Sequence, residues 1–179
     1  MRIITGAFKG RRLEAPRWDG LRPTSDKLRE TLFNIIAARV PDARVLDAFA
    51  GTGALGLESL SRGAREVVFV ESDRRAVALI AANVERCGAS DRCVIIRDTA
   101  ERVLQKTIAG EPFDLVMLDP PYDYDPLGPV LTSAGAHLAP GGLLILEHAT
   151  RRPTPTVDGL VATRTVRSGD SSLTMFEAG

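Results

Sequence analysis

One short stretch of this chain places unusual residue types directly after an apolar run. Residues 113–118 read Phe-Asp-Leu-Val-Met-Leu, which is typical of a strand covered on both faces of a parallel sheet. The run ends at Asp119, which is followed by Pro120, Pro121 and Tyr122. The Asp119 carboxylate and the Pro120 carbonyl are hydrogen-bond acceptors, and proline stiffens the chain that presents them. Two fixed acceptors are suited to grip a planar amino group.

Methyl transfer to a planar amine is a reaction that needs such acceptors. The lone pair of this nitrogen is delocalised, and acceptors on its hydrogens help it become tetrahedral and face the methyl donor. Tyr122 offers a face on which an unstacked base can stack. We therefore predict a catalytic role for Asp119, Pro120, Pro121 and Tyr122. The alternative interpretation is a proline-rich turn that follows an edge strand.

A glycine pattern indicates a second chemical feature around residue 50. Gly51, Gly53 and Gly56 follow an apolar run and open a helical pattern, which lets the backbone turn sharply and approach a ligand. Glu71 ends the next apolar run, where a carboxylate can accept hydrogen bonds from ribose hydroxyls. The glycine pattern alone is equally compatible with a structural turn, but this context favours a nucleotide-like cofactor.

The acids near the predicted strand ends discriminate between two cofactor classes. Asp47 would repel the pyrophosphate of a nicotinamide dinucleotide but suits the ammonium of S-adenosylmethionine, or an ordering network. Asp98 can accept a hydrogen bond from the adenine amine, or it caps the helical pattern that follows. The sequence favours S-adenosylmethionine. The expected cofactor contacts are Asp47, Phe49, Gly51, Gly53, Glu71, Ser72, Asp98 and Thr99.

Strand-like and helix-like segments alternate along most of the chain. Strands are predicted over 44–49, 66–72, 92–98, 113–118 and 141–149. Helices are predicted over 53–63, 73–88, 99–110 and part of 126–138. Two alternating runs around a turn predict a closing hairpin over 159–178. The expected fold is α/β, a doubly wound, mostly parallel, seven-stranded Rossmann-like sheet that ends in an antiparallel hairpin, with ligands bound beyond the strands' carboxyl ends.

The beginning of the chain differs from the rest in its charge. Residues 1–29 contain eight Lys and Arg but three acids, although the whole chain has a net charge of zero. This surface is either a footprint for phosphates or an ordinary solvated face. We expect a small hairpin over 2–15 and an amphipathic helix over 24–40, capped by Thr24 or Ser25, whose inward residues are Leu28, Leu32, Ile35 and Ile36.

Length and composition restrict the class of protein. A chain of 179 residues with 44% hydrophobic residues fits one compact unit, which we divide into a basic extension (1–40) and a main domain (41–179). Two cysteines and two histidines give neither a disulfide framework nor a histidine-rich metal site, so we expect reduced thiols and no metal. Without an apolar stretch suited to a signal peptide or a membrane span, we expect a cytoplasmic protein.

These motifs resemble those of a known enzyme class. Residues 46–64, 68–73 and 113–122 are similar to motifs of class I S-adenosylmethionine-dependent methyltransferases. The Asp-Pro-Pro-Tyr sequence is similar to the signature of enzymes that methylate planar amino nitrogens, which include adenine N6, guanine N2 and glutamine amides. Residues 1–16, 21–36 and 168–176 resemble the bacterial 16S ribosomal RNA guanine-N2 methyltransferases of the RsmD type.

The resemblance implies methyl transfer to one guanine N2 of 16S ribosomal RNA, in the small subunit or an assembly intermediate, by a monomer. It also implies RNA phosphate contacts from Lys9, Arg11, Arg12 and Arg22. Trp18 would stack on RNA or cover the N-terminal hairpin, and Thr24 would help close the site or cap a helix. The alternatives are a methyltransferase for DNA adenine N6 or a glutamine amide, and a non-catalytic RNA-binding or assembly factor.

Overall fold

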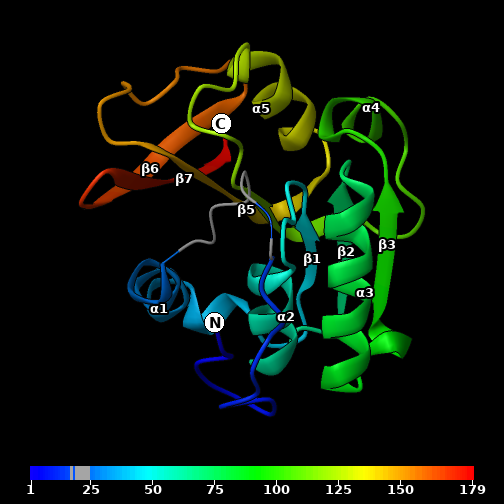
Figure 1. Cartoon of the computed structure of the whole chain (residues 1–179). Helices are drawn as coiled ribbons and strands as arrows, with labels where there is room; N and C mark the ends of the chain where they lie inside the picture. The colour runs from blue at the N-terminus through cyan, green and yellow to red at the C-terminus, as the bar shows by residue number, and fades with distance from the viewer. Residues whose placement is uncertain (17, 19–24) are drawn as a thin grey trace.

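A seven-stranded sheet forms the centre of the protein (Figure 1). The computed structural model describes residues 1–16, 18 and 25–179. The strand order is β3-β2-β1-β4-β5-β7-β6, with parallel pairing from β3 to β5 and antiparallel pairing of β7 with both β5 and β6. This confirms the predicted fold class. The strands are β1 (Arg44–Asp47), β2 (Glu66–Glu71), β3 (Cys93–Arg97), β4 (Phe113–Leu118), β5 (Leu138–Ala149), β6 (Leu160–Ser168) and β7 (Ser171–Ala178).

Helices cover both faces of the sheet and bury alternate strand residues against two apolar clusters. Val45 of β1 belongs to the cluster that contains residues of α1, α2 and α3, whereas Leu46 belongs to the cluster that contains residues of α4 and α5. Ile3, Phe8 and Leu13 join the first cluster, so the N-terminal segment shares the core of the main domain. The helices are α1 (Asp26–Ile35), α2 (Ala54–Ser61), α3 (Arg74–Cys87), α4 (Ala100–Leu104) and α5 (Leu127–Gly135), with short 3-10 helices at Ala37–Arg39 and Ser90–Arg92.

Side chains at the helix ends explain where several helices begin and stop. Ser25 caps α1 by accepting from the Leu28 amide at 3.1 Å, which confirms one of the two predicted caps. Thr24 lies outside the described residues. Asp73 caps α3 through the Arg75 amide, and Gly88 ends this helix in the left-handed conformation.

Two predicted helices are longer than the observed ones. The helix predicted over 24–40 begins at Asp26 and ends at Ile35, where one 3-10 turn follows; Leu28, Leu32 and Ile36 are buried, while Ile35 is half-buried. The helix predicted over 99–110 is reduced to α4. After α4 the chain wraps around the buried Arg44 guanidinium, which donates to the Ala109 carbonyl at 2.6 Å and to the Glu111 carbonyl.

The expected N-terminal hairpin is present in short form, with one antiparallel β-bridge between Arg2 and Arg12 and backbone hydrogen bonds from Ile3 to Arg11, Gly10 to Ile3 and Leu13 to Met1. The segment is also held against α2 by the fully buried Glu58, whose carboxylate oxygens accept from the Ile4 amide at 2.8 Å and the Thr5 amide at 3.0 Å. The Arg62 guanidinium also donates to Glu58, at 2.8 Å. Side-chain hydrogen bonds to α2 therefore add to the backbone pairing within this segment.

In the part of the chain that the structure describes, no helix has the length and apolar composition needed to cross a bilayer.

The order of the strands determines which side chains meet at each edge of the sheet. Because β1 pairs with both β2 and β4, the chain reverses its direction of strand addition at β1. Ligands bind at such a switch point, beyond the carboxyl ends of the strands.

Replacing Glu58 by Ala should destabilise the fold strongly. The substitution leaves two amides without their acceptor and leaves the Arg62 guanidinium without its buried partner, so we expect a loss of about 3 kcal/mol in the free energy of unfolding. Urea denaturation measures this loss. Glu177→Ala is the control, because Glu177 forms an exposed ion pair with Arg39 and should contribute less than about 1 kcal/mol. Similar losses for the two variants would contradict the role given to Glu58.

Candidate functional site

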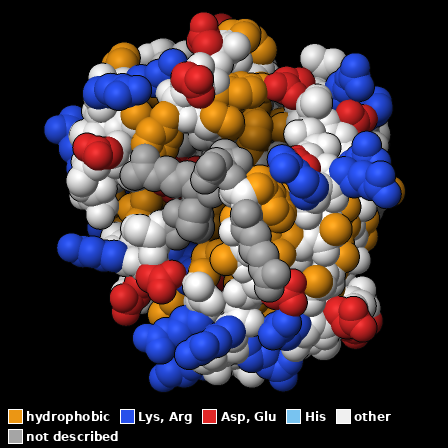
Figure 2. Space-filling view, in the orientation of Figure 1, with side chains coloured by type: hydrophobic (Ala, Val, Ile, Leu, Met, Phe, Trp, Pro, Cys, Tyr) orange, Lys and Arg blue, Asp and Glu red, His pale blue; other side chains and the backbone are white. Residues whose placement is uncertain are grey.

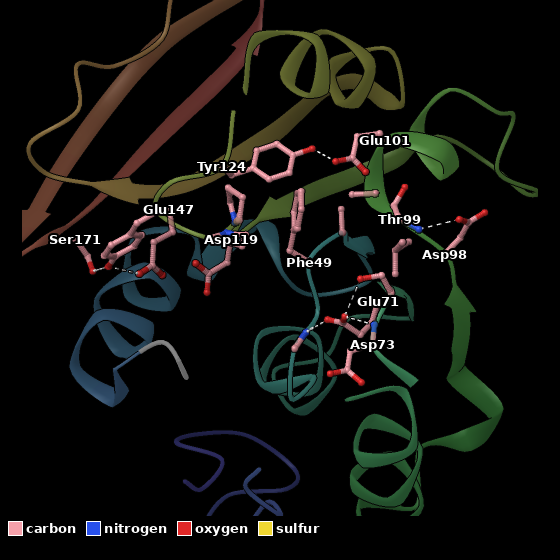
Figure 3. Close-up of a pocket in the computed structure, with 18 of the residues that line it drawn as sticks. Phe49, Glu71, Asp73, Asp98, Thr99, Glu101, Asp119, Tyr124, Glu147 and Ser171 are labelled. Carbon is pink, nitrogen blue, oxygen red and sulfur yellow. Dashed lines mark hydrogen bonds between the residues drawn. The ribbon is translucent and has the colours of Figure 1, made fainter. Parts of the chain in front are cut away.

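A cavity of about 780 Å³ opens at the carboxyl edge of the parallel strands (Figure 3). Its wall combines residues that follow β1, β2, β3 and β4 with residues of β5 and of the turn between β6 and β7. Ten of the residues predicted from the sequence line it, namely Phe49, Gly51, Glu71, Ser72, Asp98, Thr99, Asp119, Pro120, Pro121 and Tyr122. The fold therefore brings the predicted cofactor and catalytic groups into one cavity.

The glycine loop after β1 is held by the acid at the end of β2. Glu71 accepts from the Gly51 amide at 2.9 Å through one carboxylate oxygen and from the Asp73 amide at 2.8 Å through the other. Gly51 and Gly53 both have positive φ, at 54° and 76°, a backbone conformation that L side chains rarely adopt. Each carboxylate oxygen of Glu71 keeps further lone pairs, so the carboxylate can order the loop and still accept from a ligand in the cavity.

Gly56 allows α2 to pack closely on the sheet. A Cβ atom at this position would lie 2.2 Å from the Phe69 ring, so a larger residue would push the helix away from β2. Gly53 directly precedes α2 and does not line the cavity. These two glycines support the loop, while Gly51 reaches the cavity itself.

Asp47 lies behind the glycine loop and not in the cavity wall. It is 1% exposed, and one carboxylate oxygen accepts from the Gly56 amide at 3.0 Å. The other oxygen is buried without a hydrogen-bond partner among the described residues. Burial, with a smaller contribution from the Glu71 charge, raises the pKa of Asp47 to about 7, although the Gly56 amide opposes this shift. Of the two roles considered for Asp47, these contacts favour the ordering network.

The end of β3 provides a carboxylate and a helix cap. Thr99 caps α4 by accepting from the Arg102 amide, so the interpretation of Asp98 as this cap is wrong. The Thr99 amide donates to Asp98 at 2.9 Å, and this bond, followed by the charges of Lys106 and Arg102, lowers the pKa of the Asp98 carboxyl. Asp98 therefore presents a carboxylate to the cavity near neutral pH.

The residues after β4 are joined to β5 and β7. The Tyr122 hydroxyl donates to the Glu147 carboxylate at 3.4 Å and is hydrogen-bonded to the Ser171 hydroxyl. Pro120 is buried, while Asp119 and Tyr122 are half-buried at the cavity wall. The phenol end of Tyr122 is thus fixed, which limits the directions in which its ring can face.

A second aromatic pair lines the cavity near α4. The rings of Phe49 and Tyr124 meet edge to face, with centroids 5.3 Å apart. The Tyr124 hydroxyl donates to Glu101, and the Arg152 guanidinium donates to the Tyr124 carbonyl at 2.8 Å. This part of the wall combines aromatic surface with a carboxylate, which suits a flat ring that carries polar edges.

Several cavity residues were not identified from the sequence. They are Trp18 and Ser25 near the N-terminus, Ala48, Val70, Asp73, Arg75, Ala100, Glu101 and Tyr124 around the strand ends, and Glu147, Ser168, Asp170 and Ser171 from β5 and the hairpin. Trp18, which the sequence predicts as an RNA contact or a cover for the N-terminal hairpin, lies in the cavity wall, with the Arg75 guanidinium 4.9 Å from its ring centroid. A usable sequence signal existed for Glu147, which is a charged residue within an apolar strand.

The basic N-terminal residues lie away from the cavity. Lys9, Arg11 and Arg12 are exposed and do not line it, and the Arg11 guanidinium donates to the Arg86 carbonyl near the end of α3. Arg75 near the start of α3 does line the cavity, so roughly 17 Å of helix separates the two places. Figure 2 shows Lys and Arg side chains gathered along the lower edge of the molecule, where the N-terminal segment lies. Arg22 is outside the described residues.

Asn83 connects the N-terminal segment to the glycine loop. This fully buried side chain of α3 accepts from the Glu14 amide at 2.7 Å and donates to the Glu14 and Thr52 carbonyls, each at 3.2 Å. The contacts join three separate parts of the chain through one amide group. The path of the N-terminal segment is therefore coupled to the loop behind the cavity.

Replacing Asp47 by Asn should change how stability depends on pH. The folded protein holds the Asp47 proton up to about pH 7, whereas the unfolded chain loses it near pH 4, so this group's stabilising contribution falls as pH rises between these values. The difference in the free energy of unfolding, wild type minus Asp47→Asn, should fall by up to about 1.4 kcal/mol per pH unit in this window. Denaturation at several pH values measures it, and parallel profiles would contradict the assignment.

Comparison with known proteins matches nearly the whole chain. Residues 1–177 match the model of the family described as "Conserved hypothetical protein 95". Ribosomal RNA small subunit methyltransferase D of Escherichia coli K12 is 38% identical over 159 residues, which are 88% of this chain and 79% of that protein. The protein of the same name from Haemophilus influenzae is 30% identical over 181 residues, covering 99% of this chain and 93% of its own length.

A solved structure shares both the fold and the sequence similarity. The Escherichia coli protein yhhF superimposes with a TM-score of 0.88 at 34% identity, covering 99% of this chain and 97% of its own. The similarity thus includes the sheet, the hairpin and the N-terminal segment.

Proposed function

This chain belongs to the RsmD family, and from that premise we propose that it transfers a methyl group from S-adenosylmethionine to N2 of one guanine in 16S ribosomal RNA. The observation that carries the proposal is the position of Asp119 and Pro120. These two residues line the same cavity as the glycine loop and Glu71, so an amine acceptor lies beside a nucleotide-like subsite. The names of the relatives support an RNA of the small subunit as substrate.

The residues of the cavity fit S-adenosylmethionine better than a phosphate-bearing cofactor. Glu71, Asp98 and Glu101 place carboxylates in the wall, which suits a ligand with hydroxyl and amine donors and a positive charge. Phe49 and Tyr124 supply the aromatic surface for a flat ring. Glu71, Asp98, Phe49 and Gly51 would hold the cofactor, with Ser72 and Thr99 beside them. When bound, S-adenosylmethionine supplies an electrophilic methyl group on a sulfonium.

The residues after β4 would prepare the target nitrogen. The Asp119 carboxylate and the Pro120 carbonyl accept the hydrogens of the amine, which favours a tetrahedral nitrogen with its lone pair directed into the cavity. Pro121 stiffens this segment, and Tyr122, fixed through Ser171, faces the base. The nitrogen gains a methyl group and loses one proton, and the Asp119 carboxylate is placed to receive that proton.

The basic N-terminal extension would provide attraction for RNA. Residues 1–40 place Lys9, Arg11 and Arg12 on the exposed surface near the end of α3, while residues 41–179 contain the sheet and most of the cavity wall. One RNA hairpin would contact both the cavity and this surface, which are separated by roughly 17 Å along α3. We propose that a monomer acts in this way on the small subunit or an assembly intermediate.

Labelled methyl transfer to undermethylated small subunits tests this function. We expect label in 16S ribosomal RNA at one guanine, located by nuclease mapping, and label in protein or DNA would overturn the proposed substrate.

Asp119→Ala should lower the transfer rate by about 100-fold or more, because it removes an acceptor for the amine. Cofactor binding, measured by calorimetry, should remain, since the contacts expected for the cofactor do not include Asp119. Equal loss of binding and transfer would mean that Asp119 has a structural role.

Arg11→Gln/Arg12→Gln should weaken RNA binding and flatten its salt dependence. Each lost phosphate contact reduces the slope of log binding constant against log salt by about 0.7 to 0.9, so the double variant should lose about 1.5. Filter binding between low and moderate salt measures the slope. The control is Arg39→Gln/Arg65→Gln, because both arginines are paired with glutamates. An unchanged slope in the Arg11/Arg12 variant would place the RNA-binding surface elsewhere.

A further inference from the structure

A second carboxylate lies beside the amine acceptor of the cavity. The parallel pairing of β4 and β5 places Leu118 opposite Leu146, so Asp119 and Glu147 follow at the same edge of neighbouring strands. Both line the cavity, and Figure 3 shows their carboxylates next to each other and directed to the same side. A ligand group held by Asp119 would therefore lie close to the Glu147 carboxylate.

Burying the Glu147 carboxylate costs folding free energy, and packing of the strand does not require a charged residue at this position. It is 6% exposed and lies in the buried half of β5, where its neighbours in sequence are Leu146 and His148. Burying a carboxylate is unfavourable unless hydrogen bonds hold it. The Tyr122 hydroxyl is one such donor, and the same hydroxyl is joined to Ser171 of β7. The carboxylate is thus fixed by residues of the predicted catalytic segment and the hairpin.

The chemistry of planar amines shows what two adjacent acceptors can select. In guanine the N2 amine stands next to N1–H, so the edge presents donors side by side. In adenine the N6 amine stands next to N1, in cytosine the N4 amine stands next to N3, and in a glutamine amide it stands next to a carbonyl, all of which are acceptors. A carboxylate beside the amine therefore attracts guanine and repels the other three.

We infer that Glu147 is the residue that selects guanine, by accepting N1–H while Asp119 and Pro120 accept the amine hydrogens. This inference rests on the proposed function and extends it to the recognition of the base. A carboxylate has about four lone-pair directions, so Glu147 can accept from the base and from Tyr122 together. Tyr122 then has a positioning role, because its hydroxyl orients the carboxylate that reads the base.

The test compares two RNAs that differ in one base, at its N1 and C6 positions. Small-subunit RNA is prepared with either guanine or 2-aminopurine at the mapped nucleotide; 2-aminopurine keeps the amine but lacks the C6 oxygen and carries an acceptor at N1. Comparing wild type with Glu147→Gln on both RNAs isolates the part of the preference that depends on Glu147. The wild-type enzyme should prefer guanine by about 10- to 100-fold in kcat/KM, as expected for loss of one paired donor. Glu147→Gln should reduce this preference to about threefold or less, because its amide can donate to N1 of 2-aminopurine.

Matched variants separate recognition from folding. Glu177→Gln makes the same change on β7 outside the cavity and should leave the preference unchanged. Glu147→Asp retains the charge on a shorter side chain and should keep guanine preferred at a lower rate, even if Glu147→Gln fails to fold. Cofactor calorimetry and thermal melting report whether each variant is folded.

The outcomes also separate this inference from the proposed function. If the wild-type enzyme methylates no guanine in the RNA, the proposed function fails. If it methylates guanine but Glu147→Gln slows both RNAs equally and retains the preference, Glu147 is a structural residue and only the inference is overturned. A collapse of the preference with cofactor binding retained supports the assignment.

Discussion

The parallel pairing of β1 with both β2 and β4 is the constraint on which the rest of the structure depends. β1 is buried along its whole length, so its neighbours must pair at fixed register and all four carboxyl ends of β1 to β4 meet at one edge. That edge receives the glycine loop, Glu71, Asp98 and Asp119, which are distant in sequence. The apolar character of the strands therefore determines the position of the polar groups.

The antiparallel hairpin completes the cavity because β7 runs opposite to β5. Pairing Ala149 with Ser171 places the start of β7 beside the end of β5, which is the same edge at which β4 ends. The turn from Ser168 to Ser171 consequently lines the same cavity as the glycine loop and supplies the partner of Tyr122. A seventh parallel strand would have begun at the opposite edge of the sheet, so the direction of β7 is a requirement of the site.

Sequence reasoning found the residues that interrupt a regular pattern and missed those that depend on distant contacts. Asp119 was predictable because it ends an apolar run, and Ser25 because it precedes a helical pattern. Tyr124 and Glu101 meet across 23 residues through a loop and a short helix, and no local spacing signals their contact. The end of α4 was misplaced because Arg44, far away in sequence, holds the following loop. Glu147 interrupts an apolar strand and was detectable for that reason, but its position beside Asp119 depends on the pairing of β4 with β5.

The distribution of charge reconciles a neutral chain with the proposed RNA partner. A cavity rich in carboxylates suits a cationic cofactor and the donors of a base, but it repels phosphates. At physiological salt this repulsion fades over about 8 Å, whereas the basic surface near Arg86 lies roughly 17 Å along α3 from the cavity. The charges of the two surfaces are thus largely screened from each other. RNA backbone can be attracted at the end of α3 while the acids act only on the base that enters the cavity, so a net charge of zero is no argument against binding RNA.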